Sequence, residues 1–89
     1  MEIEYDPEKS AKNAAERGLP FDTVKRFDWQ SAWIAEDIRF AYPETRYIAY
    51  GLLDGRLHAL VFAETAAGIR VISLRKANKR EVKTYESHP

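Results

Sequence analysis

The chain of 89 residues contains no cysteine and only two histidines, His58 and His88. Without cysteine, a disulfide framework and a thiolate metal site are both excluded. The histidines do not follow a metal-binding spacing and no carboxylates cluster, so we expect neither a metal nor another cofactor. His58 can be interpreted as a general base or as a packing residue, and its place inside an apolar strand favours packing.

Long apolar runs and glycine-rich loops are also missing. No segment approaches the roughly 18 apolar residues of a membrane span, and no basic segment followed by an apolar one predicts a secretory signal. The four glycines are isolated, so no phosphate-binding loop is present. Together with the absence of cysteine, these features predict a cytoplasmic protein that does not contact a membrane. The length predicts a single domain over residues 1–89.

Net charge is lacking as well, because 14 basic side chains balance 14 acidic ones. The balance hides an asymmetry: residues 1–44 carry a net charge of −4 and residues 45–89 a net charge of +4. Within residues 70–83, six basic side chains stand against one acid, Glu81. This imbalance indicates a surface for nucleic acid, with a solvated helix face as the alternative.

The first half of the chain predicts a short strand at residues 3–5 followed by two helices. Asp6 and Pro7 are typical of a helix start, and Gly18 of a helix end. A second, shorter helix is expected near residues 21–27, with Val24 and Phe27 buried. The first helix is expected to pack through a stripe of small residues: Ala11, Ala14 and Ala15.

The second half predicts consecutive antiparallel strands. A strand is proposed at 32–37, a loop at 40–44, and further strands at 45–53, 56–64 and 69–74. Asp54-Gly55 is a strong signal for a type I′ hairpin turn. The nearly continuous apolar character of residues 57–62 indicates a strand covered on both faces. A last helix is expected from Ala77 or Asn78, with Asn78 as N-cap, Glu81 at its third position, and Val82 and Tyr85 on one face.

This order predicts an α+β fold. Two N-terminal helices would pack on one face of an antiparallel meander of about four strands, and a C-terminal helix would follow. The opposite sheet face would be either solvated or reserved for a partner.

The junction between the last strand and the last helix carries the densest chemistry. On a regular strand Arg70 and Arg75 would face opposite sides, whereas Lys76, Arg80 and Lys83 would share a helix face at i, i+4, i+7 spacing. Guanidinium groups match phosphate geometry and keep their charge. In metal-free RNA cleavage the 2′-hydroxyl attacks its own phosphate, and such groups stabilise the developing negative charge. An acidic partner protein docking on the same surface is the alternative.

Two motifs in these regions resemble the BrnT family of toxins from bacterial type II toxin–antitoxin systems. Residues 5–13 and 18–21 are similar to the family's aromatic-Asp-x-x-Lys-x-x-x-Asn opening and the Gly-x-x-Phe that follows it. Residues 70–81 are similar to its Arg-Ile-Ile-Ser-Ala-Arg-x-Ala-x-x-x-Glu signature. Two departures stand out: Glu16-Arg17 replaces a common Lys-His pair, and Leu74 replaces a small residue.

The resemblance implies a RelE-like fold and an endoribonuclease that inhibits translation. It also implies a BrnA-like antitoxin with a ribbon-helix-helix part, through which the complex would bind DNA. A non-catalytic protein-binding module, or an inactive toxin homologue that acts through its partner complex, is the alternative.

The residues proposed for catalysis are Arg75, Arg80, Lys79, Glu81 and Tyr85. The two arginines would stabilise the phosphate or the transition state. Glu81 would act as a base or simply as a helix N-terminal charge, and Tyr85 would shuttle a proton or pack in the core. Lys79 and Lys12 are proposed for RNA contact or proton transfer. The further RNA-binding residues are Lys9, Arg70, Lys76 and Lys83.

Overall fold

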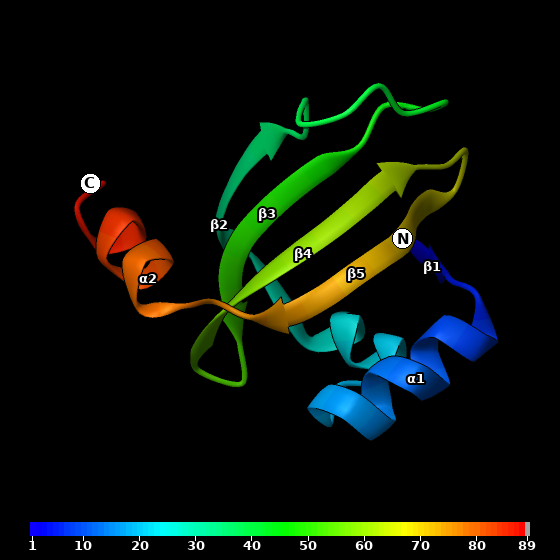
Figure 1. Cartoon of the computed structure of the whole chain (residues 1–89), viewed down its shortest axis with the longest axis horizontal. Coiled ribbons are helices and arrows are strands. Elements are labelled where there is room, and N and C mark those ends of the chain that lie inside the picture. The colour runs from blue at the N-terminus through cyan, green and yellow to red at the C-terminus, as the bar shows by residue number, and fades with distance from the viewer. Residues whose placement is uncertain (89) are drawn as a thin grey trace.

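The computed structural model describes residues 1–88, which form one five-stranded sheet with helices on both of its faces (Figure 1). The strands lie in the order β1-β5-β4-β3-β2. The elements in chain order are β1 (Glu2–Glu4), α1 (Pro7–Arg17), the 3₁₀ helix η1 (Phe21–Arg26), β2 (Phe27–Glu36), β3 (Tyr47–Leu53), β4 (Arg56–Glu64), β5 (Gly68–Lys76) and α2 (Lys79–Glu86).

The antiparallel meander is confirmed as the four strands β2 to β5. Asp54 and Gly55 take positive φ values of 51° and 79°, as a type I′ turn requires. The seven central residues of β4 are buried, which confirms that this strand is covered on both faces.

The sheet is mixed rather than purely antiparallel, because β1 pairs in parallel with β5. Residue Glu2 lies opposite Gly68, where an added Cβ would fall on the backbone of Glu2. Glycine at the start of β5 therefore lets the N-terminal strand approach and extend the sheet by one strand.

One face of the sheet, which we call the inner face, carries the hydrophobic core and is covered mainly by η1. Phe21 and Val24 of η1 pack in one core with Leu60 and Leu74 of the sheet. The predicted second helix is thus a 3₁₀ helix that ends at Arg26, and the burial predicted for Val24 and Phe27 is confirmed.

Polar contacts attach α1, so the predicted alanine stripe is wrong. Ala11 and Ala15 are exposed, and the buried residue of this helix is Ser10. The Ser10 hydroxyl accepts a hydrogen bond from the backbone N–H of Phe21 at 2.9 Å. The Asn13 amide donates to the carbonyl oxygens of Leu19 and Leu74 at 2.7 and 2.9 Å. Asp6 and Gly18 cap the helix as predicted.

Strand β2 begins five residues earlier than predicted, because an irregularity between Asp28 and Trp33 hides its pattern. Ser31 bridges this irregularity: its hydroxyl donates to the Asp28 carbonyl and accepts from the Leu52 N–H. The extra residues break the period of two on which strand prediction depends.

A second bulge, in β5, reverses the prediction for Arg70 and Arg75. Val61 pairs with Ser73 but Phe62 pairs with Val71, so Ile72 is an extra residue. Arg70 pairs with Ala63 and Arg75 with Ala59, which are four residues apart and share one face of β4. Both arginines therefore lie on the same face of the sheet, opposite the core. We call this face the outer face.

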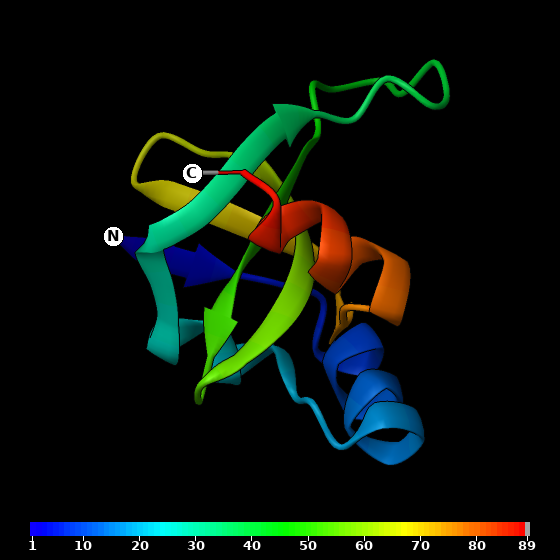
Figure 2. The same ribbon diagram turned by 90° about the vertical axis from the view of Figure 1, so that its left-hand side faces the viewer.

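The helix α2 packs on the outer face (Figure 2). Asn78 and Glu81 form the predicted capping box, and the Tyr85 hydroxyl donates to the carbonyl of Ser31 in β2. The prediction that Lys76, Arg80 and Lys83 share a helix face is wrong. The helix α2 begins only at Lys79, and Lys76 belongs to β5. Among residues 1–88, no helix combines the length and apolar character needed to cross a membrane.

Candidate active site

The outer face carries a row of aromatic, small and basic side chains beside α2. Cross-strand pairing places Trp33, Tyr50, Ala59 and Arg75 in one line across β2 to β5. The neighbouring row is small or apolar: Ala35, Ile48, Val61 and Ser73. The second row therefore presents small and apolar side chains next to the guanidinium group of Arg75.

Arg75 and Glu81 form the central ion pair of this face. The two terminal nitrogens of Arg75 donate to the two carboxylate oxygens of Glu81 at 2.7 and 2.8 Å. The Tyr50 hydroxyl donates to Glu81 Oε2 at 3.1 Å. The side chains of Arg75 and Glu81 are 34% and 17% exposed, so the pair is partly desolvated and still reachable. The sequence predicted both residues, and the fold brings them together.

The capping box holds Glu81 in this position. Its Oε1 accepts from the backbone N–H of Asn78 at 2.9 Å, and its own N–H donates to the Asn78 side chain at 2.8 Å. The same carboxylate thus serves the helix N-terminus and Arg75. The interpretation as a helix N-terminal charge is confirmed by this contact.

The electrostatics make Glu81 a weak proton acceptor. Hydrogen bonds from Arg75, and then from Asn78 and Tyr50, lower the pKa of Glu81 to about 2 against the opposing effect of burial. Burial and the hydrogen bond to Glu81 raise the pKa of Tyr50. At neutral pH Glu81 is charged and Tyr50 keeps its proton, so the site presents oriented donors rather than a strong base.

A pocket of about 220 Å³ opens between α2 and the outer face. Arg80 lies at this pocket and is exposed, and Tyr85 is half-buried in its wall. Lys79 and Lys83 are exposed on the same helix. The full lining is Trp33, Tyr50, Arg80, Glu81, Thr84 and Tyr85.

Arg39, just after β2, carries a further guanidinium group. Its Nε and a terminal nitrogen each donate at 2.8 Å to the Asp37 carboxylate, whose side chain is 1% exposed. These bonds hold the pKa of Asp37 at about 2. The hydrogen bonds of Glu81 raise the pKa of Arg75, and the charge of Arg39 opposes that rise.

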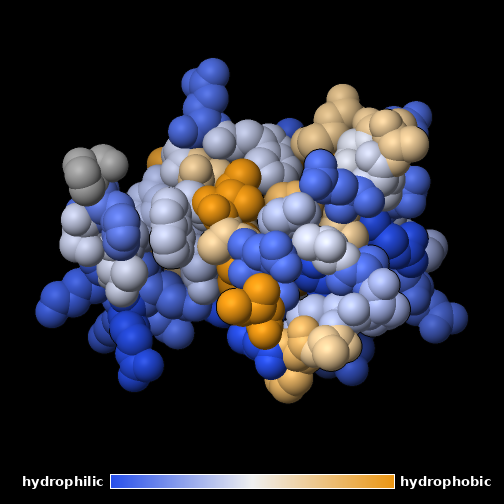
Figure 3. Space-filling view, turned by 90° about the horizontal axis from the view of Figure 1, so that it is seen from above, coloured by the Kyte–Doolittle hydropathy of each residue, from blue (hydrophilic) through white to orange (hydrophobic). Residues whose placement is uncertain are grey.

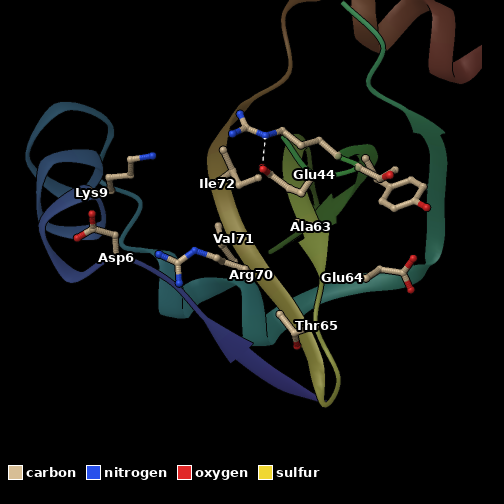
Figure 4. Close-up of a pocket in the computed structure, with 12 residues that line it drawn as sticks. Asp6, Lys9, Glu44, Ala63, Glu64, Thr65, Arg70, Val71 and Ile72 are labelled. Atoms are coloured by element: carbon tan, nitrogen blue, oxygen red, sulfur yellow. Dashed lines mark hydrogen bonds and ion pairs between the residues drawn. The ribbon is translucent and has the colours of Figure 1, made fainter. Parts of the chain in front are cut away.

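The predicted RNA-binding residues near α1 form a separate group. Lys9 and Arg70 line a depression of about 600 Å³ that does not include Arg75 or Glu81 (Figure 4). Figure 4 shows Arg70 extending from β5 toward Asp6 at the start of α1. Arg70 lies 3.9 Å from Glu4, and Lys12 lies 3.9 Å from Glu16. These four side chains are exposed, so the two ion pairs are weak.

Sequence reasoning missed Trp33, Tyr50 and Arg39. Trp33 and Arg39 lie in segments without clear periodicity, and Tyr50 is one aromatic among many in β3. The pairing of Tyr50 with Trp33 across the sheet was the missing information.

His58 is 3% exposed, and its Nδ1 lies 2.7 Å from the carbonyl of Arg56, which confirms the packing interpretation. Within residues 1–88, no three histidine, aspartate or glutamate side chains come together as a metal-binding group.

Comparison with known proteins gives one match. The family model described as the ribonuclease toxin BrnT of type II toxin–antitoxin systems matches residues 5–81. No curated protein and no solved structure matches the chain. The matched range contains both sequence motifs and the Arg75–Glu81 pair of the outer face. The chain therefore belongs to the BrnT family of ribonuclease toxins from type II toxin–antitoxin systems.

Proposed function

We propose that the protein is a cytoplasmic, metal-independent endoribonuclease that cleaves RNA on the outer face and thereby inhibits translation. The observation that carries this proposal is the Arg75–Glu81–Tyr50 arrangement beside Arg80. It holds the guanidinium group of Arg75 in place beside a row of small and apolar side chains, and Arg80 adds a positive charge. The α+β architecture supports assignment to the RelE-like folds.

The reaction needs charge stabilisation above all. The 2′-hydroxyl attacks the adjacent phosphate, the bond to the 5′-oxygen breaks, and negative charge builds up on the nonbridging oxygens. A guanidinium group has five N–H donors. Both terminal nitrogens of Arg75 donate to Glu81 and one of them also donates to the Lys76 carbonyl, which leaves the Nε–H and one terminal N–H for a phosphate. Arg80 is exposed and forms no ion pair within residues 1–88, so it can bind the same phosphate.

We assign Glu81 the positioning of Arg75 rather than the role of base. A carboxylate with a pKa of about 2 accepts a proton poorly at neutral pH. We assign the donation of a proton to the leaving 5′-oxygen to Lys79, which is exposed at the start of α2, and solvent water takes the proton of the 2′-hydroxyl. Tyr50 and Tyr85 are less suited, since their hydroxyls already donate to Glu81 and to the Ser31 carbonyl.

Neither departure from the family pattern replaces a side chain of the Arg75–Glu81 pair, although Leu74 directly precedes Arg75. Glu16 and Arg17 are exposed on the last turn of α1, and Glu16 pairs with Lys12. Leu74 is fully buried in the core, and its carbonyl anchors Asn13. We infer that neither departure abolishes activity.

Membership of this family implies an antitoxin partner, and we propose a BrnA-like protein with a ribbon-helix-helix part that carries DNA binding. Ile34, Ile38 and Phe40 are 47%, 79% and 69% exposed on or just after the edge strand β2. Figure 3 shows apolar side chains gathered among hydrophilic ones on the molecule seen from above. Exposed apolar side chains of this kind are typical of surfaces that a partner protein covers.

The test is cleavage of labelled RNA by the purified, antitoxin-free chain with and without EDTA. We expect cleavage that EDTA leaves unchanged. Arg75→Ala should reduce the rate about 100- to 1,000-fold, the usual effect of removing one donor to a transition-state oxyanion. Lys25→Ala removes an exposed charge from η1 and is the matched control, with no expected change.

Two results would overturn the proposal: no cleavage by the wild-type chain, or full activity of Arg75→Ala. RNA or antitoxin binding without cleavage would favour the non-catalytic binding module instead.

A further inference from the structure

Trp33 is the exposed aromatic residue of the outer face. Its side chain is 45% exposed, although an indole is among the most costly groups to leave in water. The other tryptophan, Trp29, packs edge-on against Phe27 and Phe62 in the core. The exposure of Trp33 is therefore not explained by packing.

The ring of Trp33 is already part of a stack. It lies nearly parallel to Tyr50, with centroids 6.1 Å apart and an interplanar angle of 26°. His88 lies against it with centroids 5.2 Å apart and an angle of 31°. The indole thus already has two flat rings at stacking distance, and the pairing of β2 with β3 holds its backbone in place.

Trp33 and Tyr50 of this stack line the 220 Å³ pocket, together with Arg80 and Glu81 of α2. Glu81 belongs both to the pocket and to its contact with Arg75. An apolar, ring-lined pocket therefore opens directly beside the guanidinium groups that would hold a phosphate. This combination suits a nucleotide, whose flat base is apolar on its faces and whose phosphate is anionic.

We propose that this pocket binds one nucleobase of the RNA strand, stacked on Trp33, next to the phosphate that Arg75 and Arg80 hold. The inference rests on the proposed ribonuclease function. The charge favours a nucleic acid over a protein segment as the occupant, because Arg80 lines the pocket and the exposed Lys79 precedes it in α2. Stacking on a π face tolerates every base, so the pocket fixes the strand rather than its sequence.

The experiment measures binding of a fluorescein-labelled, ten-nucleotide 2′-O-methyl RNA, which lacks the attacking hydroxyl. A second probe has the same length and charge but abasic sugars at its four central positions. Trp33→Ala should weaken binding of the base-bearing probe about 5- to 100-fold and leave the abasic probe unchanged. Trp33→Phe should retain most of the affinity, which controls for loss of folding.

Ile34→Ala is the matched control, because Ile34 is the next residue of β2, equally exposed, and faces the other side of the sheet. It should change neither probe. Arg80→Ala should weaken both probes alike, since it acts through phosphate rather than through a base.

Three results would overturn the inference. The first is that wild type and Trp33→Ala bind the base-bearing probe equally well while Arg80→Ala binds it more weakly. This result would show that the pocket binds no base, and it would leave the proposed function standing. Equal weakening of both probes by Trp33→Ala would show that the ring has only a structural role. Failure of the wild-type chain both to bind and to cleave RNA would overturn the proposed function as well.

Discussion

At the scale of single residues, the site depends on one carboxylate with three tasks. Glu81 closes the capping box with Asn78, orients the guanidinium of Arg75, and accepts a hydrogen bond from Tyr50. Charge-assisted bonds of this kind are about twice as strong as neutral ones. Because all three depend on the ionised form, Glu81 links the charge state of the site to the stability of α2.

This link predicts a specific pH dependence of stability. The pKa of Glu81 is lowered from 4.5 to about 2 in the folded chain. Its contribution is therefore fully present above pH 4.5 and is lost as the pH falls from about 4.5 to about 2. Glu81→Gln should lower the free energy of unfolding by about 2 kcal/mol at pH 7, and this difference should shrink toward pH 2.

Urea denaturation followed by circular dichroism at pH 7, 4.5 and 3 measures this difference. Asp54→Asn is the control, because Asp54 also pairs with an arginine, Arg26, but both side chains are more than half exposed. Its effect should be smaller at every pH. A difference for Glu81→Gln that stays constant over this range would contradict the link.

At the scale of elements, α1 is attached by hydrogen bonds where apolar contact was expected. Its side chains bury little area, and Asn13 connects the helix both to the following loop and to the end of β5. The bond to the Leu74 carbonyl spans 61 residues of sequence and lies one residue from Arg75. The same few atoms therefore fix α1 and the strand end that carries the site.

Asn13→Ala should consequently destabilise the chain by about 1 to 3 kcal/mol, because it leaves two partly buried carbonyl groups without a donor. Thermal unfolding followed by circular dichroism checks this value. The neighbouring variant Lys12→Ala, which removes an exposed side chain from the same helix, should change stability by no more than about 0.5 kcal/mol. Equal stability of the two variants would show that α1 is held by other contacts.

At the scale of the whole molecule, the charge is neutral but unevenly distributed. The second half of the chain carries a net charge of +4 and contributes most of the basic residues of the outer face and α2. Several of these charges are already paired: Arg75 with Glu81, and Arg46 with Glu44. Only part of the positive charge is therefore available to phosphate groups.

RNA binding should accordingly show a modest dependence on salt. Three or four phosphate contacts on a single strand predict a slope of log K against log salt concentration of about −2 to −3. Arg80→Ala should reduce the magnitude by about 0.7, whereas Lys25→Ala should leave it unchanged. A titration of the uncleavable probe between 50 and 300 mM potassium chloride measures the slope. A value near zero would exclude an electrostatic RNA surface.

The sequence by itself determined much of this protein. Caps, turns and apolar runs are local signals, so Asp6, Gly18, Asp54-Gly55 and the buried strand β4 could be predicted. Two sequence motifs also indicated the ribonuclease toxin family, and one of them contains Arg75 and Glu81.

Only the tertiary structure decided how the site is assembled. The bulge at Ile72 turned Arg75 to the same face as Arg70, and strand pairing brought Trp33 to Tyr50. The physical reason is that one inserted residue changes the side to which every later side chain points, and nothing local in the sequence marks it. The fold likewise decided how the basic residues are grouped: Arg75 and Arg80 lie beside the aromatic residues of the outer face, whereas Lys9 and Lys12 lie on α1.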